Sequence, residues 1–134
     1  MPARAEDDGE RGSAVVDFVL VSVLVVALLF AVLQVAVYVH VRNVVTASAQ
    51  EGARYAASAD VPSGLGGDRT LQVVARATSE QTARGLACTS GEALDSTGLT
   101  LVVVRCTGDV PSLFAPLGNL LPLDVTGRSV KEGL

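Results

Sequence analysis

Positive charge is scarce and scattered along this chain. Its 134 residues hold ten Lys and Arg against fourteen Asp and Glu, which gives a formal net charge of −4. A surface that binds nucleic acid needs clustered Lys and Arg to neutralise phosphates. The sequence has no such cluster, so we expect no nucleic-acid partner.

Residues that carry enzymatic and metal chemistry are also few. The single histidine, His40, is far in sequence from the two cysteines, Cys88 and Cys106, and these are too few ligands for a zinc site. The serines lack a histidine in a plausible catalytic constellation, and no glycine-rich loop has phosphate-binding spacing. We therefore expect no enzyme activity, no cofactor, no metal and no small-molecule substrate.

A long apolar run near the N-terminus accounts for much of the 49% hydrophobic content. Residues 18–39 carry no charge and are interrupted only by Ser22 and Gln34. At ~1.5 Å per residue these positions span roughly 33 Å, enough for a hydrocarbon core of ~30 Å. A lone segment in lipid must satisfy its own backbone hydrogen bonds, so it must be helical.

Three other interpretations of this run were weighed. A cleaved secretory signal has an apolar region of only about 7–15 residues, although Ala47-Ser48-Ala49 imitates its cut site. A buried core helix would need a larger domain than this length allows. A plain single-pass anchor, without special processing, remains open. Tyr38 and His40, at the far end of the run, are interpreted as anchors at the membrane interface.

The junction before the run joins a polar leader to Gly12, followed by four small or apolar residues from Ser13, then Asp17 and Phe18. This resembles the class III signal of type IV pilins and pseudopilins. In those proteins a prepilin peptidase cuts after the glycine, on the cytoplasmic side, and the apolar helix is retained. The resemblance implies a processing site at Gly12 and Ser13. The family normally has Glu where Asp17 stands, so the acid here is one methylene shorter.

A second stretch sharpens the resemblance. The Ala-rich segment that ends in Glu51-Gly52-Ala53-Arg54-Tyr55 is similar to the helix beyond the membrane in TadE-like proteins of tight-adherence pilus systems. The likeness covers about residues 11–58. It implies a minor pilin or pseudopilin that acts by helix-mediated assembly, with a prepilin peptidase, other pilin subunits and the tight-adherence secretion platform as partners.

The resemblance also implies a domain organisation and a location. We expect a leader over residues 1–12, a transmembrane helix over 13–40 and an extracytoplasmic domain over 41–134. The chain would cross the cytoplasmic (inner) membrane once, with its N-terminus in the cytoplasm, and a pilus is the second location that the resemblance implies. The alternative is a membrane-anchored extracytoplasmic binding module with no role in a filament.

Asp17 has two interpretations. A carboxylate in an apolar helix is costly when it faces lipid, so it is expected at the interface or with a partner. A cut after Gly12 would create an α-amino group at Ser13, which Asp17 of a neighbouring subunit would bind, with Phe18 beside it in the assembly contact. Otherwise Asp17 is an exposed acid favoured by the helix dipole.

The two cysteines predict one disulfide if their domain lies outside the cytoplasm. It would close a loop of about 19 residues, which contributes roughly 3 kcal/mol in the chain-entropy model. Two free thiols are the alternative. The positions of Lys and Arg do not settle the orientation, because two arginines lie close before the apolar run and two lie close after it.

For the rest of the chain we predict an α+β fold with a short antiparallel β-sheet. The first helix continues to about Ser58, with a packing face that includes Val44 and Tyr55. A Pro- and Gly-rich break at 60–67 precedes a second helix, which is capped by Asp68 and continues to about Ala83. Strands are expected at 100–105 and 125–130, with an apolar loop at 109–118 that covers the core or binds a partner.

Overall fold

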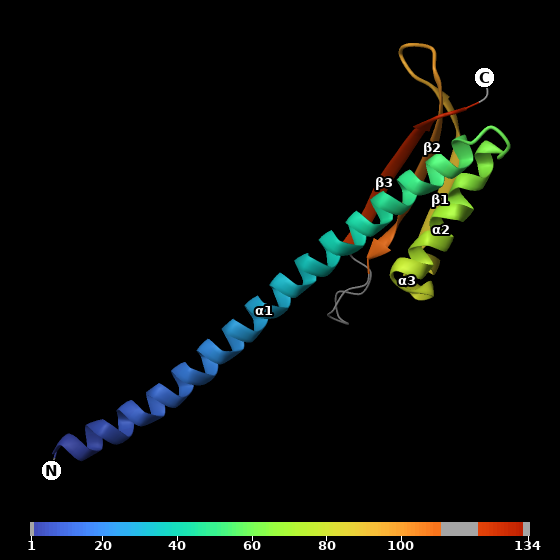
Figure 1. The fold of residues 1–134 in the computed structure, drawn as a ribbon. Helices are drawn as coiled ribbons and strands as arrows, with labels where there is room; N and C mark the ends of the chain where they lie inside the picture. The colour runs from blue at the N-terminus through green and yellow to red at the C-terminus, as the bar shows by residue number, and fades with distance from the viewer. Residues whose placement is uncertain (1, 111–120, 133–134) are drawn as a thin grey trace. The chain divides into compact units, whose positions relative to one another are not determined.

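The computed structural model describes the backbone of residues 2–110 and 121–132, and the side chains of residues 11–110 and 122–132. The chain divides into two compact units, Met1–Ala36 and Val37–Leu134. Helix α1 (Pro2–Ala57) begins in the first unit and ends in the second (Figure 1). The predicted apolar loop lies mostly in residues 111–120, outside the described residues.

The second unit is built on a three-stranded antiparallel sheet in the order β1-β2-β3. Its strands are β1 (Leu86–Leu94), β2 (Thr100–Val110) and β3 (Leu121–Val130). The fold is therefore α+β with a short antiparallel sheet, as predicted. Strands β2 and β3 include the two predicted runs and are longer than expected, whereas β1 was not predicted.

A tight hairpin joins β1 to β2. One Asp95 carboxylate oxygen accepts hydrogen bonds from the backbone N–H groups of Thr97 and Leu99, at 2.8 and 3.0 Å, and from the Thr97 hydroxyl. Gly98 has a positive φ of 86°, a conformation that glycine adopts without steric cost. Thr97 and Gly98 thus form the turn between the two strands.

One face of the sheet packs against helices and the other is open. Along β2 the side chains of Val102, Val104, Cys106 and Val110 are buried, while Arg105 between them is exposed. Such alternation is typical of an antiparallel sheet with one solvated face. In Figure 1 the C-terminal part of α1 and helix α2 (Gly66–Ala77) lie on one side of the sheet.

The connection between α1 and the sheet differs from the prediction. A short 3-10 helix, η1 (Ser63–Leu65), leads directly into α2, so α2 begins at Gly66 and Asp68 lies inside its first turn. The predicted cap at Asp68 is wrong. The helix also does not continue to Ala83.

A break at Thr78 and Ser79 divides the second predicted helix. Ser79 begins the short helix α3 (Glu80–Arg84), and its hydroxyl accepts a hydrogen bond from the Thr82 N–H at 3.1 Å. A serine in this position competes with helix continuation because it caps a new N-terminus. Gly85 follows α3 as its C-terminal cap.

The packing face of α1 is only partly as predicted. Tyr55 is 41% exposed and Val44 is only partly buried. The other positions of the predicted face are buried, and Ala49, Ala53 and Ala57 are buried with them. The buried residues of this stretch are Val41, Val45, Ser48, Ala49, Gly52, Ala53, Ala56 and Ala57.

Candidate assembly sites

The predicted processing and assembly residues lie together on α1 in the first unit. Ser13, Asp17 and Phe18 are exposed, and Phe18 is exposed by 73%. A Cβ atom added at Gly12 would meet no atom within 4 Å. Ser13 and Asp17 are four residues apart, which is about 6 Å along a helix axis. Within the described residues the Asp17 carboxylate has no hydrogen bond or ion pair, so it is available to a partner.

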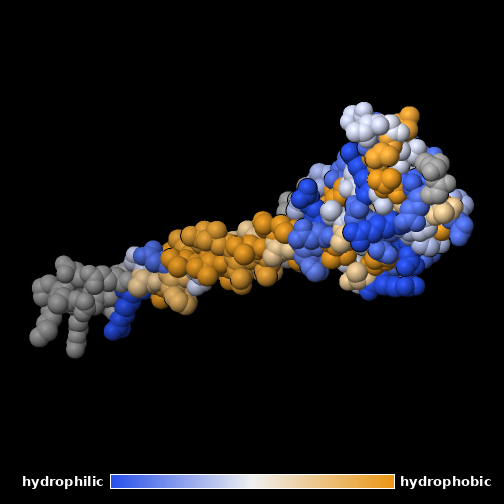
Figure 2. Space-filling model, turned by 45° about the horizontal axis from the view of Figure 1, so that its top comes forward, coloured by the Kyte–Doolittle hydropathy of each residue, from blue (hydrophilic) through white to orange (hydrophobic). Residues whose placement is uncertain are grey.

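The helix that follows carries large apolar side chains that nothing in the described chain covers. Figure 2 shows this apolar band along the first part of α1. Valine, leucine and phenylalanine side chains between Val15 and Leu33 are exposed by 41–65%, apart from Phe18 with its higher value. Among the described residues, one helix is long and apolar enough to cross a membrane, and none of its most apolar window is buried.

The small residues of the Glu51–Tyr55 motif serve close packing in the second unit. Gly52 faces Thr70 and the Gly66 carbonyl of α2, and an added Cβ would lie 2.5 Å from that carbonyl oxygen. Ala53 is fully buried. A similar approach occurs one turn earlier on α1, where Gly127 of β3 faces the Ala49 backbone. These contacts leave no space for a larger side chain.

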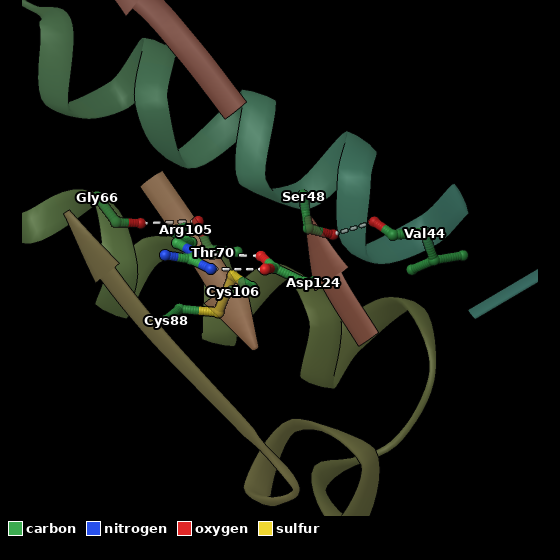
Figure 3. Close-up of a disulfide and its surroundings, with 8 residues drawn as sticks. All are labelled: Val44, Ser48, Gly66, Thr70, Cys88, Arg105, Cys106 and Asp124. Carbon is green, nitrogen blue, oxygen red and sulfur yellow. Dashed lines mark hydrogen bonds and ion pairs between the residues drawn. A yellow bond between two sulfur atoms is a disulfide. The ribbon is translucent and has the colours of Figure 1, made fainter. Parts of the chain in front are cut away.

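Buried hydroxyls near this contact bond to their own helices. Ser48 Oγ donates to the Val44 carbonyl at 2.7 Å, and Thr70 Oγ1 donates to the Gly66 carbonyl at 2.8 Å (Figure 3). Each buried polar group is therefore satisfied locally, which avoids the cost of an unpaired hydroxyl. The two helices can then approach each other through small side chains alone.

The charged residues of the same motif point outward. Glu51 and Arg54 are exposed, and neither makes a hydrogen bond or ion pair within the described residues. Tyr55 lies beneath Arg69 of α2, whose guanidinium carbon is 5.3 Å from the ring centroid. That distance is within the range of a cation–π contact.

A small concavity opens beside this stacked pair. Its volume is about 180 Å³, and it is lined by Tyr55, Leu65, Asp68, Arg69 and Gln72. The Nε atom of Arg69 is buried and has no hydrogen-bond partner in the described structure.

The disulfide joins β1 to β2. Cys88 and Cys106 are bonded and are directly opposite each other in the strand register, with their Cα atoms 4.1 Å apart (Figure 3). Cys106 is fully buried in the core and Cys88 packs against it. The predicted disulfide is confirmed.

The free edge of β3 is covered by side chains of α1. The Gln50 amide donates to the Arg128 carbonyl at 2.6 Å and accepts from the Arg128 N–H at 3.1 Å. The Tyr38 hydroxyl donates to the Pro122 carbonyl at 3.0 Å. These bonds occupy groups that would otherwise pair with another strand. Tyr38 therefore has a contact within the folded unit, while its role as a membrane anchor stays a prediction.

Lys131, the only lysine, holds the C-terminal end of α1. Its Nζ donates to the carbonyls of Ala56, Ser58 and Val61 at 2.9, 3.2 and 2.6 Å. The next residue, Glu132, donates its N–H to the Ala57 carbonyl at 2.7 Å. An ammonium group is favourable here because the last carbonyls of a helix lack partners and carry partial negative charge.

The open face of the sheet carries one ion pair. Arg105 of β2 donates from Nε and Nη2 to the two carboxylate oxygens of Asp124 on β3, at 3.1 and 2.6 Å. The hydrogen bond from Arg105 holds the pKa of Asp124 below its ordinary value, and the same bond raises the pKa of Arg105. Both groups are exposed, so this pair contributes little to folding.

A helix with an uncovered apolar surface, joined to a small disulfide-bonded α+β unit, indicates the class of single-pass membrane proteins. Residues 12–54 match the family model described as TadE-like protein, so over this range the chain is similar to that family, as the sequence resemblance predicted. No curated protein and no solved structure matches the chain.

The predicted site residues fall into two groups. Gly12, Ser13, Asp17 and Phe18 belong to the first unit, while the Glu51–Tyr55 motif and both cysteines belong to the second. Their roles in processing and assembly stay predictions. Sequence reasoning missed Arg69 and Lys131. The fact that Lys131 is the only lysine was a possible signal, but its contacts depend on the fold.

Proposed function

We propose that the chain is a minor pilin or pseudopilin of a tight-adherence pilus system, and that it acts by subunit assembly in the membrane. The observation that carries the proposal is the match of residues 12–54 to the TadE-like family. That range begins at the proposed cut, includes the whole apolar segment and ends within the Glu51–Tyr55 motif. An uncovered apolar helix supports it, because such a surface needs lipid or other helices around it.

The proposed domain organisation follows the sequence. Residues 1–12 are a leader that a prepilin peptidase removes, residues 13–40 cross the inner membrane, and residues 41–134 form the domain outside. The disulfide supports this orientation, because disulfides persist in extracytoplasmic compartments and are rare in the cytoplasm. The N-terminus then lies on the cytoplasmic side, where the peptidase acts.

Asp17 guides assembly in this proposal. After the cut, the new ammonium group of Ser13 on one subunit binds the Asp17 carboxylate of a neighbour. The exposure of Asp17 supports this role, and so does the lack of a partner for its carboxylate among the described residues. An ion pair at the edge of lipid compensates the cost of both charges and fixes the register of the two helices.

Processing tests the proposal. With the peptidase present, the unmodified chain should be shortened to an N-terminus at Ser13, and Gly12→Leu should stay full length because the bulky side chain blocks the cut. Gly64→Leu is the control, since an added Cβ there also meets nothing within 4 Å and the position is far from the junction. N-terminal sequencing of membrane extracts reads both results.

The alternative, a membrane-anchored binding module, predicts a different result. Its leader would remain on the unmodified chain and on Gly12→Leu alike, because no peptidase recognises the junction. An uncut chain in cells whose peptidase processes another pilin would contradict the pilin proposal.

A further inference from the structure

Two charge pairs in the second unit form no ion pair within the described residues. Glu51 and Arg54, which we call the ridge, are exposed on α1. Asp68 and Arg69 lie on α2 beside the concavity described above, which we call the socket. Among described residues, none of the four forms an ion pair or accepts or donates a side-chain hydrogen bond.

Arg69 is arranged to bind a carboxylate. Its guanidinium stacks on Tyr55, which fixes the plane of the group, and its buried Nε lacks a hydrogen-bond partner. Unlike the buried Nε, the terminal nitrogens of Arg69 remain accessible and have no hydrogen-bond partner among the described residues, so they are the donors open to an oxygen-bearing ligand. Guanidinium groups bind carboxylates through two parallel hydrogen bonds, and a fixed plane lowers the entropy cost of that contact.

The socket also contains an acid, which limits what it can bind. Asp68 repels a simple anion, so a matching ligand must present a base next to its acid. The ridge has this composition. Glu51 and Arg54 are three residues apart on one helix, or about 4.5 Å along its axis. Three-residue spacing allows an in-chain pair, yet the two side chains are not paired.

We infer that the ridge of one copy of this chain binds in the socket of a second copy, with Glu51 on Arg69 and Arg54 on Asp68. The inference rests on the proposed function, because assembly in one membrane places neighbouring copies side by side in the same orientation. Each copy offers one ridge and one socket. Every contact therefore pairs one ridge with one socket, and the two surfaces that meet are different.

Two complementary variants test this contact on the full chain. In the first, the ridge is reversed by Glu51→Arg with Arg54→Glu. In the second, the socket is reversed by Asp68→Arg with Arg69→Glu. Each variant alone brings like charges together at every contact. When the two variants are mixed, every reversed ridge can meet a reversed socket and every native ridge a native socket, so the contact is restored.

The measurement is co-purification of two differently tagged full-length copies from the bacterial inner membrane in a mild detergent at low salt. We expect each variant alone to lower co-purification by about tenfold or more, since like charges across an interface are strongly unfavourable. The mixture of both variants should return it to the level of the unmodified chain. Asp60→Arg with Arg76→Glu is the control, because both residues are exposed; it should change nothing.

Other results would overturn the inference. If the ridge binds the socket of its own chain, mixing the two variants does not restore co-purification. If the socket binds a different protein, neither variant changes co-purification of the two copies. The same holds if the four charges are only solvated.

Leader removal is recorded for each variant in the same membranes. If the leader is removed normally but the charge reversals do not change co-purification, only this contact is refuted. If the leader is not removed from the unmodified chain, the proposed function is refuted.

Discussion

The two stretches of α1 show how one helix is adapted to two surroundings. Between Val15 and Leu33 its surface is made of large apolar side chains, and none of the most apolar window is buried. Beyond Val37 the buried positions are taken mostly by small residues such as Ala49, Gly52 and Ala53. Apolar content therefore does not identify the packed part of a helix. Side-chain size does, because close packing against another backbone requires small residues.

The largest effect is expected where this close packing is broken. In Gly127→Ala the added methyl group would collide with the Ala49 and Gln50 backbone, which cannot rotate away. Overpacking of this kind costs typically 1–3 kcal/mol and occasionally more, and we expect about 3 kcal/mol here. Pulse proteolysis in urea on the full chain in detergent measures the loss. Ala27→Val, in the apolar stretch, is the matched control and should leave the unfolding of the second unit unchanged.

A smaller effect is expected at the end of the packed stretch. Lys131→Met keeps the length of the side chain but removes three charge-assisted hydrogen bonds, to the carbonyls of Ala56, Ser58 and Val61. We expect the free energy of unfolding to fall by about 2 kcal/mol, measured in the same urea series. Arg76→Met removes an exposed charge from α2 and serves as the control. Equal effects of the two substitutions would show that the Lys131 contacts do not stabilise the helix end.

The smallest effect concerns the open face of the sheet. Because the folded chain lowers the pKa of Asp124 from its ordinary value of 3.8, this carboxylate stabilises the fold above that value. The contribution is lost as the pH falls through the lowered folded pKa. The unmodified chain should therefore be slightly more stable than Asp124→Asn at pH 6, and the difference should vanish near pH 2. Thermal unfolding followed by circular dichroism at both pH values checks this.

Sequence reasoning succeeded where a pattern is local. The uncharged run from Phe18, the end of α1 before Pro62 and the valine-rich strand β2 are each encoded by their own residues. The disulfide followed from the number of cysteines and the expected compartment. The resemblance at Gly12 and Glu51 pointed to the family that residues 12–54 match.

The predictions fail where contacts between residues far apart in the sequence determine the structure. Strand β1 contains Ala, Ser, Gly and Glu, which are poor strand formers, and it forms because it pairs with β2 along its whole length. Gly66 and Gly67 were expected in a flexible linker, but they begin α2 because they allow it to approach Gly52 and Cys88. Tyr55 was expected in the core, and its partner Arg69 lies on a helix that follows a chain reversal.

The intact mass of the chain from its native membrane, measured after thiol alkylation without reduction, tests the account most directly. We predict a mass that corresponds to residues 13–134 with no alkyl group on either cysteine. A mass that retains residues 1–12 would contradict pilin-type processing. A chain that begins after Ala49 would show that the apolar helix is a discarded export signal, and the proposed assembly in the membrane would then be wrong.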